Sequence, residues 1–124
     1  METGQTYTSD QLRLEVSTDK ESLCVRFNGK SMLRDPNEFL MPILLRTLTE
    51  ANTKQKRLLL DFRSLAYMNS STLTPVIKLL EQARIGEGML TVLYRKSLKW
   101  QDIYFSALVI FRTPDGRIEI KAGE

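Results

Sequence analysis

The chain has 124 residues, a formal net charge of +3, one cysteine and no histidine. Without histidine, the Ser-His-Asp and Cys-His catalytic groups and the usual histidine zinc sites are excluded, and the lone Cys24 excludes an intramolecular disulfide and a multi-cysteine zinc site. We therefore expect no enzyme activity, no bound metal and no cofactor. The length is typical of one domain, so we expect a single domain over residues 1–124.

The N-terminal sequence, the apolar runs and the charge limit where the protein can act and what it can bind. The N-terminus lacks the basic start and apolar stretch of a secretory signal, and no apolar run is long enough to span a bilayer. We therefore expect a cytoplasmic protein with no membrane segment, which also suits the single cysteine. The basic surplus is small and accompanies no nucleic-acid-binding motif, so direct nucleic-acid binding is not expected.

The N-terminal third predicts a hairpin. Residues 1–9 are expected to be frayed. Apolar and polar residues then alternate over residues 12–17 and again over residues 22–28, which predicts two half-buried antiparallel strands. We place Cys24 in the inward phase of the second strand, near Phe27, and expect a buried, unreactive thiol.

A helix is predicted to begin at Asp35. Asp35 can cap it, Pro36 suits the first helical position, and Glu38 can reach back to the cap amide. The helix should continue to about Asn52 with one core-facing stripe. Pro42 removes an interior hydrogen bond, which predicts a kink or a later start.

The remaining elements complete a βαβ pattern. The apolar run over residues 58–62 predicts a central strand buried on both faces. A second amphipathic helix follows from Leu73 to Gly86, then a strand over residues 89–94, a weak helix over residues 98–108 and a short edge strand at residues 118–120.

We therefore expect an α/β fold in which helices pack on a mixed sheet of about four to five strands, in the order β-β-α-β-α-β-α-β. The strand at residues 58–62 and the helix that follows it must cover each other's apolar faces. This predicts five core residues: Leu59, Phe62, Val76, Ile77 and Leu80.

Four polar residues precede the second helix: Asn69, Ser70, Ser71 and Thr72. Such side chains satisfy free amides at a helix N-terminus, where the helix dipole also favours negative charge. They can be simple capping residues. Alternatively, an exposed hydroxyl among them can be phosphorylated, which adds about −1.5 to −2 charges and repels an acidic or apolar partner surface.

The surrounding stretch carries a longer pattern. An apolar strand ends in Asp61, a short loop leads to the apolar pair Tyr67 and Met68, and Asn-Ser-Ser-Thr-Leu opens a helix. This succession resembles the STAS domain of anti-sigma-factor antagonists, whose pattern reads Asp-Ser-Ser/Thr-Gly-Leu at the helix start. Asn69 and Thr72 replace the usual Asp and Gly. An Asn before the hydroxyl residue also occurs in a phosphorylated regulator family that is similar to STAS domains.

The resemblance implies a bacterial transcription regulator that works by partner switching. Ser70 corresponds to the phosphoacceptor, Ser71 and Thr72 are fallback acceptors, and these three residues with Asn69 form the implied partner-binding segment. The implied partners are a serine kinase similar to anti-sigma factors, which binds the unmodified protein, and a serine/threonine phosphatase. Asp61 has neither a paired acid nor a histidine nearby in the pattern, so we expect a structural acid that braces its loop.

Two other functions are compatible with the sequence. The first is a constitutive interaction or scaffold module of the same fold that is not phosphorylated. The second is a small-molecule or nucleotide-binding regulatory domain that uses the helix N-terminus at Ser70, Ser71 and Thr72 as an anion site.

Overall fold

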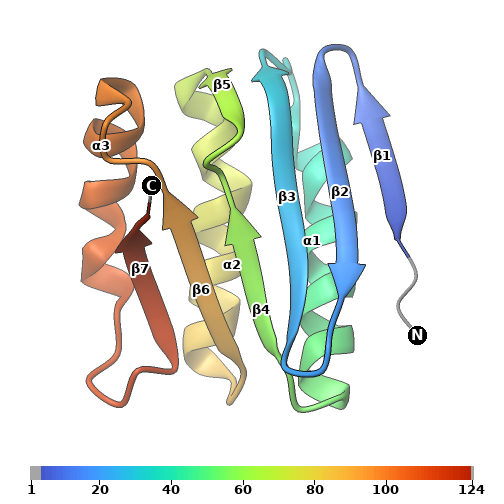
Figure 1. Cartoon of the computed structure of the whole chain (residues 1–124), viewed down its shortest axis with the longest axis vertical. Helices are drawn as coiled ribbons and strands as arrows, with labels where there is room; N and C mark the ends of the chain where they lie inside the picture. Colours follow the sequence, from blue (N-terminus) through green and yellow to red (C-terminus); the bar gives the residue numbers. More distant parts are fainter. Residues whose placement is uncertain (1–3, 124) are drawn as a thin grey trace.

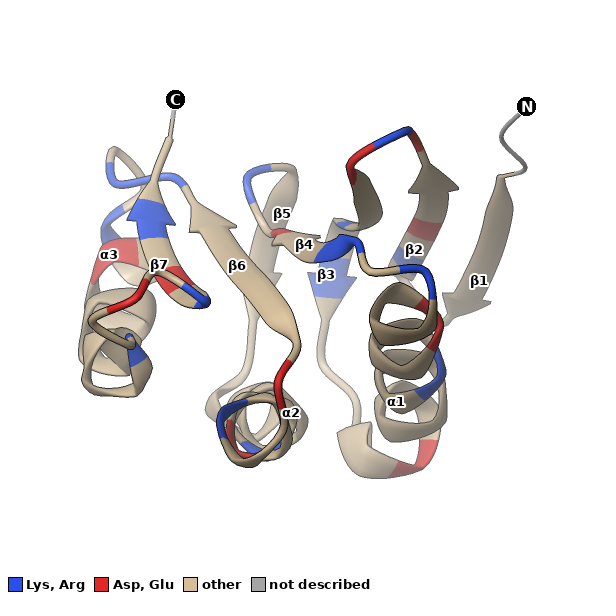
Figure 2. Cartoon of the chain, turned by 90° about the horizontal axis from the view of Figure 1, so that it is seen from below, with Lys and Arg blue, Asp and Glu red and all other residues tan. Residues whose placement is uncertain are grey.

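The computed structural model describes residues 4–123, which form a single sheet with its helices on one side (Figures 1 and 2). The elements in chain order are β1 Gln5–Ser9, β2 Leu12–Thr18, β3 Ser22–Ser31, α1 Pro36–Thr53, β4 Arg57–Asp61, β5 Leu65–Met68, η1 Ser70–Thr72, α2 Leu73–Ile85, β6 Met89–Tyr94, α3 Lys99–Ser106, η2 Ala107–Phe111 and β7 Ile118–Ala122.

The sheet is mixed, as predicted. Its strand order is β1-β2-β3-β4-β6-β7, and β5 pairs with β3 beyond the end of β4. The first three strands are antiparallel, whereas β3, β4, β6 and β7 run parallel, with helices in the connections. The prediction that the strand at residues 58–62 is central is confirmed, because β4 lies between β3 and β6.

The described residues contain two strands more than we expected. Gln5–Ser9, predicted to be frayed, instead forms the edge strand β1, which pairs with β2 through a tight turn at Asp10, where φ is 54°. Residues 1–3 of that prediction lie outside the described part of the chain. β5 was not expected either, because its sequence Leu-Ala-Tyr-Met is only four residues long and shows no alternation of apolar and polar residues.

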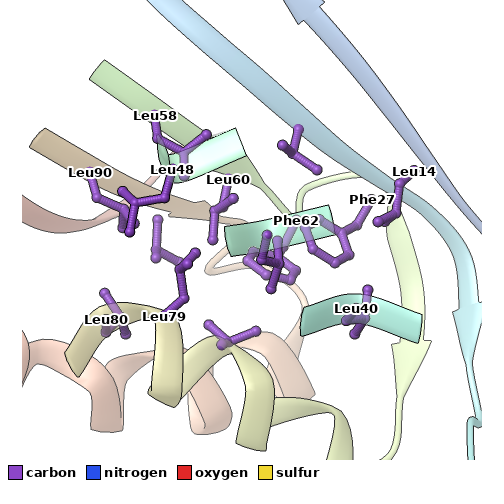
Figure 3. Packing of buried hydrophobic residues seen from close by; sticks show 14 of the residues in the cluster. Leu14, Phe27, Leu40, Leu48, Leu58, Leu60, Phe62, Leu79, Leu80 and Leu90 are labelled. Carbon is purple, nitrogen blue, oxygen red and sulfur yellow. The ribbon is translucent and has the colours of Figure 1, made fainter. Parts of the chain in front are cut away.

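The core lies between the helices and one face of the sheet (Figure 3). Phe62, Val76 and Leu80 are fully buried, as predicted, and Ile77 is half-buried. The prediction that β4 is buried on both faces is wrong, because α1, α2 and α3 all cover the same face (Figure 2). Leu59 points to the uncovered face and is partly exposed.

Cys24 also lies on the uncovered face, so its predicted inward phase is wrong. The inward residues of β3 are the fully buried Leu23, Val25 and Phe27, and strand alternation turns Cys24 the other way. The side chain is nevertheless partly covered. Burial raises the pKa of the Cys24 thiol, and the nearby charge of Asp61 raises it further.

The predicted capping box of α1 does not form. α1 begins at Pro36 and continues through Pro42 to Thr53, but the Asp35 side chain makes no capping hydrogen bond within the described residues. The Glu38 backbone N–H instead donates to the Asp35 carbonyl at 3.2 Å. Pro36 therefore starts the helix through its fixed φ and its missing N–H donor.

Candidate functional site

Residues 69–72 follow β5 at the end of the sheet where β3 also ends (Figure 1). Ser31, the last residue of β3, is paired in register with Met68. The Asn69 backbone N–H then donates to the Ser31 carbonyl at 2.9 Å. The end of β3 therefore determines where this segment starts.

The Asn69 side chain is tied down on both of its polar atoms. Its Nδ2 donates to the Leu33 carbonyl at 3.2 Å. Its Oδ1 accepts hydrogen bonds from Thr72 Oγ1 at 2.6 Å and from Ser71 Oγ at 3.2 Å. Neither Asn69 nor Thr72 makes a side-chain cap to a backbone amide in the described residues, so simple capping is not what these side chains do.

The two departures from the STAS pattern belong to one network of hydrogen bonds. Asn69 donates to a backbone carbonyl, which an ionised Asp in its place cannot do. Thr72 is fully buried, and its hydroxyl lies 2.7 Å from the Ser31 hydroxyl as well as bonding to Asn69, whereas Gly has no side chain for either contact. Each replacement therefore supplies an interaction that the usual residue lacks.

The three hydroxyls of the segment differ in access. Ser70 and Ser71 are exposed, but Thr72 is completely buried. The Ser71 hydroxyl donates to Asn69, whereas the Ser70 hydroxyl makes no side-chain hydrogen bond within residues 4–123. The expectation that Thr72 can serve as a fallback acceptor is therefore corrected, because an enzyme cannot reach its hydroxyl without opening the fold.

Two large apolar side chains are exposed at the same end of the sheet. Met32 directly follows Ser31 and is 66% exposed. Tyr67 lies two residues before Asn69, is 40% exposed, and has its ring 6.0 Å from that of Trp100 on α3. Both side chains therefore add apolar surface at the end of the sheet that carries the exposed Ser70 and Ser71.

Asp61 holds the turn between β4 and β5. Its carboxylate is buried and accepts hydrogen bonds from the Arg63 backbone N–H and from Arg63 Nε and Nη2, each at 3.0 Å. Arg26 Nε lies 3.7 Å away. Burial alone would raise the pKa of Asp61, but the hydrogen bonds from Arg63 and the charges of Arg63 and Arg26 outweigh it and lower the pKa.

Gln101 on α3 supports the same turn, and the sequence analysis missed it. It is fully buried, and its Nε2 donates to the carbonyls of Phe62 and Leu65 at 2.7 and 3.0 Å. Its Oε1 accepts from the Arg95 N–H at 2.7 Å. The available signal was its position four residues before the buried Phe105, which places a polar side chain on the inward face of the helix.

Other kinds of site are sparse in the described part of the chain. No three acidic or cysteine side chains of residues 4–123 gather where they could hold a metal ion. No helix among those residues combines the length and hydrophobicity needed to cross a membrane. A surface cavity of about 720 Å³ is lined by Ser22, Arg57 and Leu59 among others, at the opposite end of β3 from the serines.

Comparison of the sequence with protein-family models and with curated proteins finds no match. Among solved structures, an anti-sigma factor antagonist from Mycobacterium paratuberculosis is similar, with a TM-score of 0.55 and 14% sequence identity. The similarity covers 94% of this chain and 91% of that one. With this coverage, the similarity shows that the chain has a STAS-like fold.

Proposed function

We propose that the protein is a partner-switching regulator of the anti-sigma-factor-antagonist type. In its unmodified state it binds a serine kinase similar to anti-sigma factors, and phosphorylation of Ser70 releases it. A serine/threonine phosphatase restores the binding state. The protein is then the substrate of the kinase and not an enzyme itself.

The observation that carries this proposal is the difference in access between Ser70 and Thr72. Ser70 is exposed and has no side-chain hydrogen bond within the described residues, whereas the neighbouring Asn69 and Thr72 are held by hydrogen bonds to each other, to Leu33 and to Ser31. A kinase can therefore reach the Ser70 hydroxyl without breaking a side-chain hydrogen bond, on a backbone that is already fixed. Ser71 is the second choice, because phosphate transfer there must break its bond to Asn69.

The position of Ser70 explains why a phosphate would act on binding more than on folding. Ser70 opens η1, which continues into α2, so added negative charge meets the positive end of the helix dipole. The partner, by contrast, would contact the apolar side chains of Met32 and Tyr67 beside it. A charge buried against such a contact without a counter-ion costs more than a neutral polar group, whose burial without a hydrogen bond already costs roughly 2–7 kcal/mol.

The test compares four purified proteins for capture of a partner from lysate of the source cells: wild type, Ser70→Ala, Ser70→Asp and Lys78→Asp. Lys78 is an exposed residue of α2, and its variant controls for added negative charge on the same helix. Once the captured kinase is identified, its affinity for each variant is measured. We expect Ser70→Asp to lose at least about 10-fold in affinity, and Ser70→Ala and Lys78→Asp to bind like wild type.

Phosphate mapping completes the test. Incubation with the captured kinase and ATP should add one phosphate to wild type and none to Ser70→Ala. Phosphate on Ser71 would move the acceptor by one residue and keep the mechanism. Unimpaired binding by Ser70→Asp would instead contradict the switch and favour a constitutive scaffold of the same fold. The alternative of a small-molecule site at Ser70 gains no support from the 720 Å³ cavity, which lies at the other end of β3.

A further inference from the structure

The two edges of the sheet are protected to different degrees. At the β7 edge, the Thr113 backbone N–H donates to the Ile118 carbonyl at 3.2 Å, and the Ile118 N–H donates to Thr113 Oγ1 at 3.0 Å. β7 also carries the charged Glu119 and Lys121. A covering loop and charged side chains are two ways in which proteins block pairing at an exposed edge.

The β1 edge has neither form of protection. β1 is the last strand on its side of the sheet, and no described segment pairs with its outer edge. Its sequence, Gln-Thr-Tyr-Thr-Ser, contains no charge and no proline, and Thr and Tyr favour strands. An uncharged, regular edge of this kind is a template for another strand.

The hydrogen bonds of β2 show which β1 groups face outward. The Asp19 N–H bonds to the Ser22 carbonyl and the Lys30 N–H to the Gln11 carbonyl, so the odd-numbered residues along this stretch bond toward β3. Because bonding alternates along an antiparallel pair, the even-numbered residues of β2 bond toward β1.

The register of β1 and β2 then assigns each residue of the edge. The even-numbered residues of β2 are opposite Gln5, Tyr7 and Ser9. Thr6 and Thr8 therefore direct their backbone N–H and C=O groups away from β2, toward the open side of the sheet. Their side chains are exposed as well.

We propose that β1 pairs antiparallel with β1 of a second copy of this chain, around a two-fold axis at Tyr7, so that one sheet continues through both copies. This register places Thr6 opposite Thr8 of the second copy, and each such pair exchanges both of its N–H···O bonds. Facing Thr side chains are a favourable cross-strand pair, and no like charges meet along β1.

Tyr7 suits the position on the axis. Its hydroxyl accepts a hydrogen bond from Arg46 of α1 at 2.6 Å, and the Arg46 guanidinium carbon lies 5.4 Å from the centre of its ring. The side chain is thus held against its own helix layer and does not cover the strand edge. At the axis the two Tyr7 residues form a non-hydrogen-bonded pair, where facing side chains come closest.

The register predicts a charge pattern that can be tested by sedimentation equilibrium up to about 1 mM protein. T6K/T8K and T6E/T8E each place like charges opposite one another and should be monomeric. T6K/T8E makes the Lys at position 6 face the Glu at position 8 of the second copy, so it should dimerise like wild type. An equimolar mixture of T6K/T8K and T6E/T8E should form a dimer, because each supplies the charge that the other lacks.

A proline variant and a matched control test the backbone bonds. Thr8→Pro removes an outward N–H without removing a bond to β2, so it should weaken dimerisation at least about 10-fold, while Thr8→Val should keep it. Thermal melting of each variant shows whether it is folded.

A wild type that stays monomeric throughout would overturn the proposal. So would T6K/T8K with wild-type association, or T6K/T8E that fails to dimerise although folded. Masses above the dimer would also contradict it, because pairing of β1 with β7 of another copy would grow without closing.

Discussion

The hydroxyl oxygens of Ser31 and Thr72 lie 2.7 Å apart inside the protein and join the end of β3 to the turn before α2. Both residues are completely buried. Since Thr72 also bonds to Asn69, the pair fixes the backbone on which the exposed Ser70 sits. This contact gives the first prediction.

Thr72→Val keeps the shape of the side chain but leaves the buried Ser31 hydroxyl without that partner. We expect the free energy of unfolding to fall by about 1–3 kcal/mol, measured by urea denaturation. In a double-mutant cycle with Ser31→Ala, the two losses should be non-additive by at least about 0.5 kcal/mol. Strictly additive losses would show that the contact contributes nothing, and the exposed Ser70→Ala serves as the neutral control.

Asp61→Asn tests the buried carboxylate through pH. Because the pKa of Asp61 is lowered in the folded state, its ionisation stabilises the fold above the unfolded pKa of about 3.9, and that stability is lost as pH falls through the folded value. The stability difference between wild type and Asp61→Asn should therefore be largest near neutral pH and shrink below about pH 4. A difference that stays constant from neutral to acidic pH would show that the charge is not responsible.

Adjacent leucines of β4 test the one-sided core. Leu60 is fully buried against the helices, so Leu60→Ala should cost about 2–5 kcal/mol in unfolding free energy. Leu59 lies on the uncovered face, and Leu59→Ala should cost about 1 kcal/mol or less. Equal losses in chemical denaturation would mean that something covers the other face in solution.

Gly29 and Gly116 form a matched glycine pair. Both have positive φ, 86° and 79°, but a Cβ on Gly29 would collide with the Gln11 carbonyl, whereas one on Gly116 meets no atom within 4 Å. Gly116→Ala should cost roughly 1 kcal/mol from its backbone conformation alone. Gly29→Ala should cost clearly more, and similar thermal shifts for the two variants would contradict the collision.

Most of the fold follows from local patterns in the sequence. The alternation of apolar and polar residues predicted β2 and β3. The proline at the start of α1 marked where that helix begins, and the glycine after α2 marked where that helix ends. β5 could not be found this way, because Leu65 and Met68 are buried while Ala66 and Tyr67 are exposed. It forms because the ten-residue β3 extends past β4 and offers a tertiary partner.

The sequence also did not reveal that the helices cover only one face of the sheet. A run of three leucines fits both a strand buried on two faces and one whose middle leucine is partly exposed. The choice depends on which side the crossover helices take, and that is a property of the whole chain.

The candidate site was predicted in position but not in detail. Residue type and spacing pointed to residues 69–72, yet the access of each hydroxyl depends on Ser31 and Leu33, which are distant in the sequence. Thr72 looked like its neighbours as a polar residue at a helix start. Only its contact with β3 shows that it belongs to the interior.

The length of β3 also separates the parts of the chain that tolerate insertions from those that do not. β3 pairs with β4 as far as Arg26 and with β5 from Gly29 onward, so it aligns both strands (Figure 1). A residue added to the turn after Phe62 can loop out while β5 keeps its place. A residue added inside β3 would turn the following side chains to the opposite face and move Ser31 away from Thr72. The position of Ser70 and Ser71 relative to the sheet therefore depends on Ser31, which lies 41 residues before Thr72 in the sequence.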